Sequence, residues 1–61
     1  MTANEFVDLC YALWGDDWVY SLHKRLDIST RSIKRWANGA KPVPVEVAGI
    51  IRFMSAKAGQ Q

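Results

Sequence analysis

The sequence predicts a small all-α domain of four helices, and three observations support this fold class. The chain has 61 residues, 49% of them hydrophobic, which is typical of a folded chain and enough for one domain. Apolar residues recur at steps of three and four in four segments, as they do on one face of a helix. No segment alternates apolar and polar residues, so we expect no strand. Residues 1–61 are therefore interpreted as a single domain.

The first predicted helix begins at Ala3 and carries one apolar stripe. Thr2 and Glu5 have the spacing of a capping box, and Met1 and Phe6 that of a hydrophobic staple. Gly15 ends this helix. The stripe consists of Ala3, Phe6, Val7, Cys10, Leu13 and Trp14.

The second and third predicted helices follow with short breaks. The second begins at Asp16 or Asp17, either of which can cap free N–H groups, and it stops near Asp27. The third has Ser29 as its N-cap and ends at Asn38-Gly39, which can adopt the left-handed conformation. Their inner faces consist of Trp18, Val19, Leu22 and Leu26, and of Ile33, Trp36 and Ala37. Ile28 and Ile33 match the staple spacing, and the three tryptophans are expected in the core.

The fourth predicted helix follows a loop over residues 40–43, with Pro44 in its first turn and Gly59 at its end. Val45 and Phe53 fall outside the apolar stripe. Because a helix in so small a domain buries one stripe, these two side chains indicate a self-association surface. We therefore expect a homodimer with Val45 and Phe53 in its interface. The stripe itself consists of Val47, Ile50, Ile51, Met54 and Ala58.

Basic residues are concentrated in one part of the chain. The net charge is only +2, but residues 23–41 contain six basic residues and one acid, a net charge of +5. Residues 1–22 contain four acids and no Lys or Arg. A basic block inside a folded domain indicates a surface for a polyanion; the alternative is a solvated helix face. The basic residues are Lys24, Arg25, Arg31, Lys34, Arg35 and Lys41.

The connection between the second and third helices is only about three residues long, Asp27-Ile28-Ser29. So short a connection makes the helices cross steeply, which is typical of a helix-turn-helix, here central and covering about residues 19–38. The stretch 19–38 resembles the helix-turn-helix of the Cro/repressor-like (XRE-type) bacterial and phage regulators. The run Arg31-Ser32-Ile33-Lys34-Arg35-Trp36-Ala37-Asn38-Gly39, then Pro42-Val43-Pro44, looks like small members of that family.

Two residues depart from the pattern of that family. Asp27 stands where the family usually has glycine in the turn, and Asp tolerates left-handed dihedral angles better than most residues. His23 stands where the family prefers a small residue. We expect His23 to be a half-buried spacer that tilts outward or widens the helix crossing.

The chemistry of the third helix fits DNA. Arg31, Lys34, Arg35 and Asn38 lie opposite its apolar face. Arginine binds guanine, and asparagine binds adenine, through paired hydrogen bonds in the major groove. The start of the helix suits phosphate, and the resemblance implies that residues 29–31, 34 and 35 face the groove. The predicted DNA-binding residues are Ser29, Thr30, Arg31, Ser32, Lys34, Arg35, Asn38 and Lys41. For Lys24 and Arg25, phosphate contact and a local role at the end of the second helix both remain open.

The same sequence offers little for other classes of function. It has no glycine-rich phosphate loop and no usable Ser-His-Asp set, so we expect no enzyme. With one Cys and one His, we expect no metal and no disulfide. No cofactor or small-molecule ligand is expected, and Cys10 is interpreted as a core residue. No apolar run is long enough to span a membrane, so we expect a cytoplasmic, nucleoid-associated protein.

We therefore expect a sequence-specific DNA-binding transcriptional regulator that binds double-stranded DNA. A repressor is favoured because no separate effector-sensing domain is visible, and it would bind an inverted-repeat operator as a dimer. One alternative is a protein-interaction module, such as an antiactivator or an antitoxin, that keeps the helix-turn-helix fold without reading DNA. A second alternative is a nucleic-acid binder without sequence preference.

Overall fold

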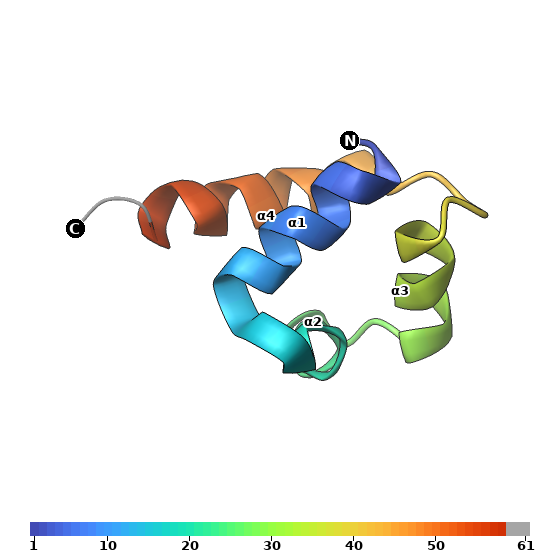
Figure 1. Cartoon of the computed structure of the whole chain (residues 1–61), viewed down its shortest axis with the longest axis horizontal. Coiled ribbons are helices and arrows are strands. Elements are labelled where there is room, and N and C mark those ends of the chain that lie inside the picture. The colour runs from blue at the N-terminus through green and yellow to red at the C-terminus, as the bar shows by residue number, and fades with distance from the viewer. Residues whose placement is uncertain (59–61) are drawn as a thin grey trace.

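A computed structural model describes residues 1–58, which form four α-helices and one short 3-10 helix and contain no strand (Figure 1). The prediction of a small all-α domain is thereby confirmed. Gly59, the predicted end of the fourth helix, lies outside the described residues. The elements are α1 (Ala3–Trp14), η1 (Gly15–Asp17), α2 (Trp18–Leu26), α3 (Thr30–Ala37) and α4 (Val45–Ala58).

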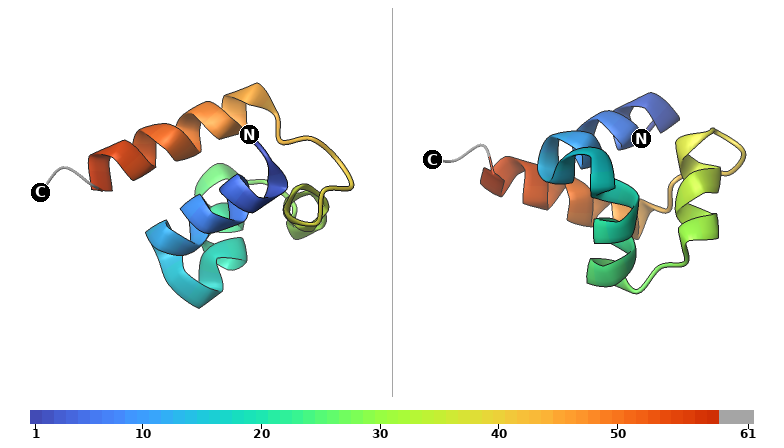
Figure 2. Two further views of the ribbon diagram at one scale, coloured as in Figure 1. Left: turned by 45° about the horizontal axis from the view of Figure 1, so that its top comes forward. Right: turned by 60° about the horizontal axis from the view of Figure 1, so that its bottom comes forward.

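α1 is the central helix of the domain. Its Cα atoms come within 8 Å of those of α2, α3 and α4. The backbone of α4 approaches α1 and no other described helix. Figure 2 shows α4 running alongside α1, with α3 at the opposite end of the molecule from the last turn of α4. α3 and the last turns of α4 therefore lie in different parts of the molecule (Figure 2).

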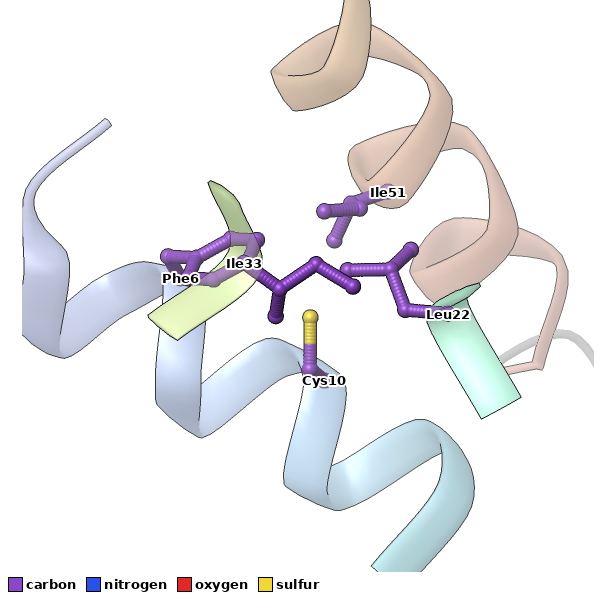
Figure 3. Packing of buried hydrophobic residues seen from close by; sticks show 5 residues of the cluster. All are labelled: Phe6, Cys10, Leu22, Ile33 and Ile51. Atoms are coloured by element: carbon purple, nitrogen blue, oxygen red, sulfur yellow. The ribbon is translucent and has the colours of Figure 1, made fainter. Parts of the chain in front are cut away.

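The core is small and takes side chains from every α-helix. Its five fully buried members point toward one another (Figure 3). The ring of Phe6 meets Trp18 and Trp36 edge-on, with centroid distances of 5.5 and 6.0 Å, an arrangement that aromatic pairs prefer. The three tryptophans are half-buried and pack against this cluster. The five fully buried residues are Phe6, Cys10, Leu22, Ile33 and Ile51.

Capping and turn residues in the sequence correctly predict both ends of α1 but not the cap at the start of α2. Thr2 Oγ1 accepts the N–H of Glu5 at 3.1 Å, and Gly15 takes a positive φ of 74° after α1, as predicted. The carboxylate cap predicted for the second helix is wrong, because Asp17 precedes α2 without a side-chain cap hydrogen bond. The N–H of Trp18 donates instead to the carbonyl of Gly15. The 3-10 turn thus supplies an acceptor that the aspartates were expected to supply.

α4 begins one residue later than predicted, and its inner face is rotated. The carbonyl of Pro44 accepts the N–H of Ala48 at 2.9 Å, so Pro44 precedes the helix. Ile50 was predicted inside but is 40% exposed, whereas Ala48 is buried. α4 packs along α1, and the small Ala48 side chain is buried. Ala58, also predicted inside, is exposed, while Ile51 is fully buried.

Candidate nucleic-acid interface

The turn between α2 and α3 has the conformation that its sequence predicts. Asp27 is left-handed, with φ 54° and ψ 43°, and is the one residue other than glycine with positive φ among residues 1–58. Ile28 packs against the core. Ser29 is the N-cap of α3, so three residues, 27–29, lie between the two helices. This helix-turn-helix holds α3 by its inner face and leaves its outer face exposed.

His23 has a role in this turn that the sequence interpretation missed. The ring is half-buried, and its Nδ1–H donates to the carbonyl of Ile28 at 2.6 Å. A carbonyl only accepts, so the proton lies on Nδ1. His23 therefore connects the last turns of α2 to the start of α3 instead of tilting outward. The sequence did contain a signal for this role, because His23 is a polar ring placed shortly before a three-residue turn.

Two of the predicted DNA-binding residues, Ser29 and Ser32, are joined at the start of α3, where Ser29 is the N-cap. Ser29 Oγ accepts the N–H of Ser32 at 3.2 Å, and its hydroxyl donates to Ser32 Oγ at 3.1 Å. Ser29 and Thr30 are exposed, and Ser32 is half-buried. The cap thus fixes the first turn of α3 and presents its N-terminal end to solvent.

Four cations lie on or beside α3, and we call them the basic surface: Arg31, Lys34, Arg35 and Lys41. All four are exposed. Residues 1–58 contain one ion pair, between Glu5 and Arg52 at 3.2 Å, so the cations of the basic surface have no acidic partner within this part of the chain. The N–H of Lys41 donates to the carbonyl of Arg35 at 3.3 Å, which places the loop at the end of α3. The positive charge therefore faces solvent without compensation.

Asn38 lies at the end of the basic surface, but its oxygen is engaged. Asn38 Oδ1 accepts the N–H of Ala40 at 2.9 Å, and Gly39 takes the left-handed conformation with φ 81°. Paired recognition of adenine uses both the oxygen and the amide group of asparagine. The bond to Ala40 uses one of the two acceptor positions of Oδ1, so the loop orients the side chain of Asn38 while one acceptor position remains for a base.

Lys24 and Arg25, at the end of α2, contact aromatic rings. Lys24 Nζ lies 5.8 Å from the ring centroid of Tyr20, and the guanidinium of Arg25 lies 5.8 Å from that of Trp14. Such contacts stabilise a cation at an exposed site by about 0.5–1 kcal/mol. The two residues thus have a local structural role, the alternative left open above, and their contact with phosphate stays a prediction.

The described residues form neither a pocket nor a group of three or more potential metal ligands. Within the same residues, no helix is long and apolar enough to cross a membrane. Comparison of the chain with protein-family models, curated proteins and solved structures found no match.

Proposed function

We propose that the chain is a sequence-specific DNA-binding transcriptional regulator that inserts α3 into the major groove of double-stranded DNA. The observation that carries the proposal is the basic surface on the outer face of α3, with no acidic partner within residues 1–58. Uncompensated cations at one face raise the local concentration of a polyanion and steer its association.

The position of Arg31 supports a ligand over a purely structural role. Arg31 lies in the first turn of α3, which has no acidic residue. The helix dipole disfavours a cation there by about 0.3–1 kcal/mol. A phosphate or a guanine edge would offset this cost, since arginine binds both through paired hydrogen bonds.

The dimensions of α3 also suit the groove. An α-helix with its side chains is about 10–12 Å in diameter, and the major groove is about 12 Å wide. Arg31 and Arg35 are one helical turn apart and exposed, so they can contact neighbouring base pairs. Ser29, Thr30 and Lys41 flank them, where phosphate contacts fix the register of the helix.

A homodimer completes the proposal. One short helix contacts few base pairs, and two copies related by a two-fold axis read an inverted repeat about 34 Å apart, centre to centre. Occupation of such an operator would block a promoter, so we propose repression, in the cytoplasm at the nucleoid. The exposed side chains of Val45 and Phe53 support self-association.

The proposal is tested by measuring binding over a salt series to two kinds of DNA: random sequences, and sequences selected for binding to this protein. If each subunit neutralises about four to six phosphates, log affinity should fall with log salt at a slope of roughly −3.5 to −5.5 per subunit. Tighter binding to selected DNA than to random DNA supports sequence reading. Equal affinities indicate a nucleic-acid binder without sequence preference. Absence of binding at any salt concentration overturns the proposal in favour of a protein-interaction module.

A further inference from the structure

One row of side chains on α4 remains exposed after the domain has folded. Glu46, Ile50, Phe53 and Lys57 follow one another at steps of four, three and four, and all are exposed. Ile50 is 40% and Phe53 64% exposed. We call these four residues the α4 seam.

The seam has the pattern by which one helix packs against another. Steps of four and three place side chains in a single line along a helix, as in a coiled coil. The two central residues are apolar, and the outer two carry opposite charges. Lys57 Nζ lies 5.5 Å from the ring centroid of Phe53, so the charge directly borders the apolar centre.

We propose that two copies of this chain associate through the α4 seam with their α4 helices antiparallel. The two-fold axis passes between Ile50 and Phe53, so that Ile50 packs against Phe53 of the partner subunit. Glu46 then lies beside Lys57 of the partner subunit, and the same pair forms again at the other end. This inference deepens the proposed function and rests on the homodimer expected there.

The charges of Glu46 and Lys57 favour a second copy of the chain as the partner and an antiparallel arrangement of the two α4 helices. In a parallel pair, Glu46 would face the partner's Glu46, and Lys57 the partner's Lys57, and like charges repel. In the antiparallel pair, both contacts are attractive. Because the seam complements itself in this way, a second copy of the chain satisfies all four positions at once.

Gly49 supplies a second argument. Glycine lowers the stability of a helix interior, and a Cβ placed at Gly49 would meet no atom within 4 Å. Packing within one subunit therefore does not require glycine there. Gly49 lies beside Ile50 and one turn before Phe53, where the absence of a side chain lets a second helix approach closely. Val45 lies farther to the side, so the proposal places Phe53 and Ile50 at the centre of the interface.

Paired charge reversal tests the seam by sedimentation equilibrium at low salt. Glu46→Lys alone, or Lys57→Glu alone, converts both attractive contacts into repulsive ones and should weaken dimerisation about tenfold. The double variant restores both contacts and should return to within about threefold of the wild-type dissociation constant. An equimolar mixture of the two single variants should form a heterodimer. Such a small interface predicts micromolar or weaker association of the wild type.

The double variant also separates association from effects within the helix. Glu46 lies in the first turn of α4 and Lys57 in the last, where each complements the helix dipole. The double variant has the least favourable arrangement for the dipole, so regained association cannot arise from helix stability. Circular dichroism checks the fold of each variant. Asp16→Lys, which changes an exposed residue of η1 by the same charge as Glu46→Lys, should leave dimerisation unchanged.

The proposal of a dimer through the α4 seam would be overturned by a wild type that remains monomeric at millimolar concentration. It would also be overturned by a dimer whose dissociation constant is unchanged in Glu46→Lys and in Lys57→Glu. Capture of a different protein by Phe53 without self-association would also overturn it. DNA binding is a separate measurement. A monomer that binds a half-site would retain the DNA-binding part of the proposed function but not the dimer, and a dimer that binds no DNA would retain only the α4 seam.

Discussion

Asp27 sits in the left-handed region, with φ 54°, where a side chain normally costs about 1–2 kcal/mol. Asp27→Gly should therefore raise the free energy of unfolding by about 0.5–1 kcal/mol, since glycine adopts this conformation without strain but gains more entropy when unfolded. Urea denaturation monitored by circular dichroism measures the change.

A matched variant separates the backbone from the charge. Asp27→Asn removes the carboxylate next to the C-terminal end of α2, where a negative charge is unfavourable, but keeps a side chain that tolerates left-handed angles. If Asn stabilises as much as Gly does, charge and not backbone strain explains the gain.

We expect Cys10 to make the free energy of unfolding depend on pH under alkaline conditions. Burial raises the pKa of its thiol from 9.0 to about 12. Above pH 9 the unfolded thiol loses its proton while the folded thiol keeps it, so the unfolded state binds fewer protons. The free energy of unfolding should then fall as pH rises, with a contribution approaching about 1.4 kcal/mol per pH unit between these two pKa values.

Urea denaturation from pH 8 to pH 11 measures this fall. Cys10→Ala removes the thiol and retains every lysine and tyrosine, so its stability should decline less steeply with pH than that of the wild type. Equal slopes would show that Cys10 does not contribute.

Among the elements, α3 carries the basic surface, and alanine variants of its residues can distinguish contacts with bases from contacts with phosphate. Arg31→Ala or Arg35→Ala should cost about 1–3 kcal/mol on a selected site and relax the preference at one base pair. Lys41→Ala should weaken binding to all sequences alike and reduce the salt slope by about 1. Fluorescence anisotropy with selected and random duplexes distinguishes the two effects.

All three side chains are exposed, so these variants should remain folded. Arg35→Ala and Lys41→Ala should unfold at about the same urea concentration as the wild type, and Arg31→Ala at a slightly higher one, because it removes the cation from the first turn of α3. Equal losses on selected and random DNA would assign Arg31 and Arg35 to phosphate.

The elements also show what the sequence can predict. Apolar periodicity located all four helices, and the caps at Thr2 and Ser29 form as expected, because a cap depends on residues three positions apart. The acceptor at the start of α2 and the His23 bond across the turn depend on the path of the backbone. Periodicity does not contain that information.

The orientation of a helix about its own axis is similarly hard to predict. Ala48 and Ile50 lie at opposite edges of the apolar face of α4, and the smaller of the two is the buried one. For the basic surface, charge and spacing predicted which side chains are exposed. They did not predict that the oxygen of Asn38 is engaged by Ala40.

For the whole molecule, we expect Phe53 to couple two subunits on DNA. Phe53→Glu places a charge at a position that is 64% exposed, so the monomer should remain folded while cooperative operator binding is lost. Sedimentation and circular dichroism on the variant, together with binding to a full operator and a half-site, test this expectation.

Tyr11→Glu is the matched control, because Tyr11 is an exposed aromatic residue of α1 (54%). It should leave cooperativity intact. A folded Phe53→Glu variant that still binds the operator cooperatively would exclude Phe53 from the interface.

The attachment of α4 has a consequence for local unfolding. The α4 backbone lies near α1 alone, and Ile51 is its fully buried side chain in the shared core (Figure 3). A segment held by so few contacts opens at a lower free energy than the rest of a domain. In dilute solution, the amide protons of α4 should exchange with solvent faster than those of α1. At high protein concentration, a second subunit lying on α4 would slow the exchange of α4 selectively, so exchange rates measured at two concentrations would report association residue by residue.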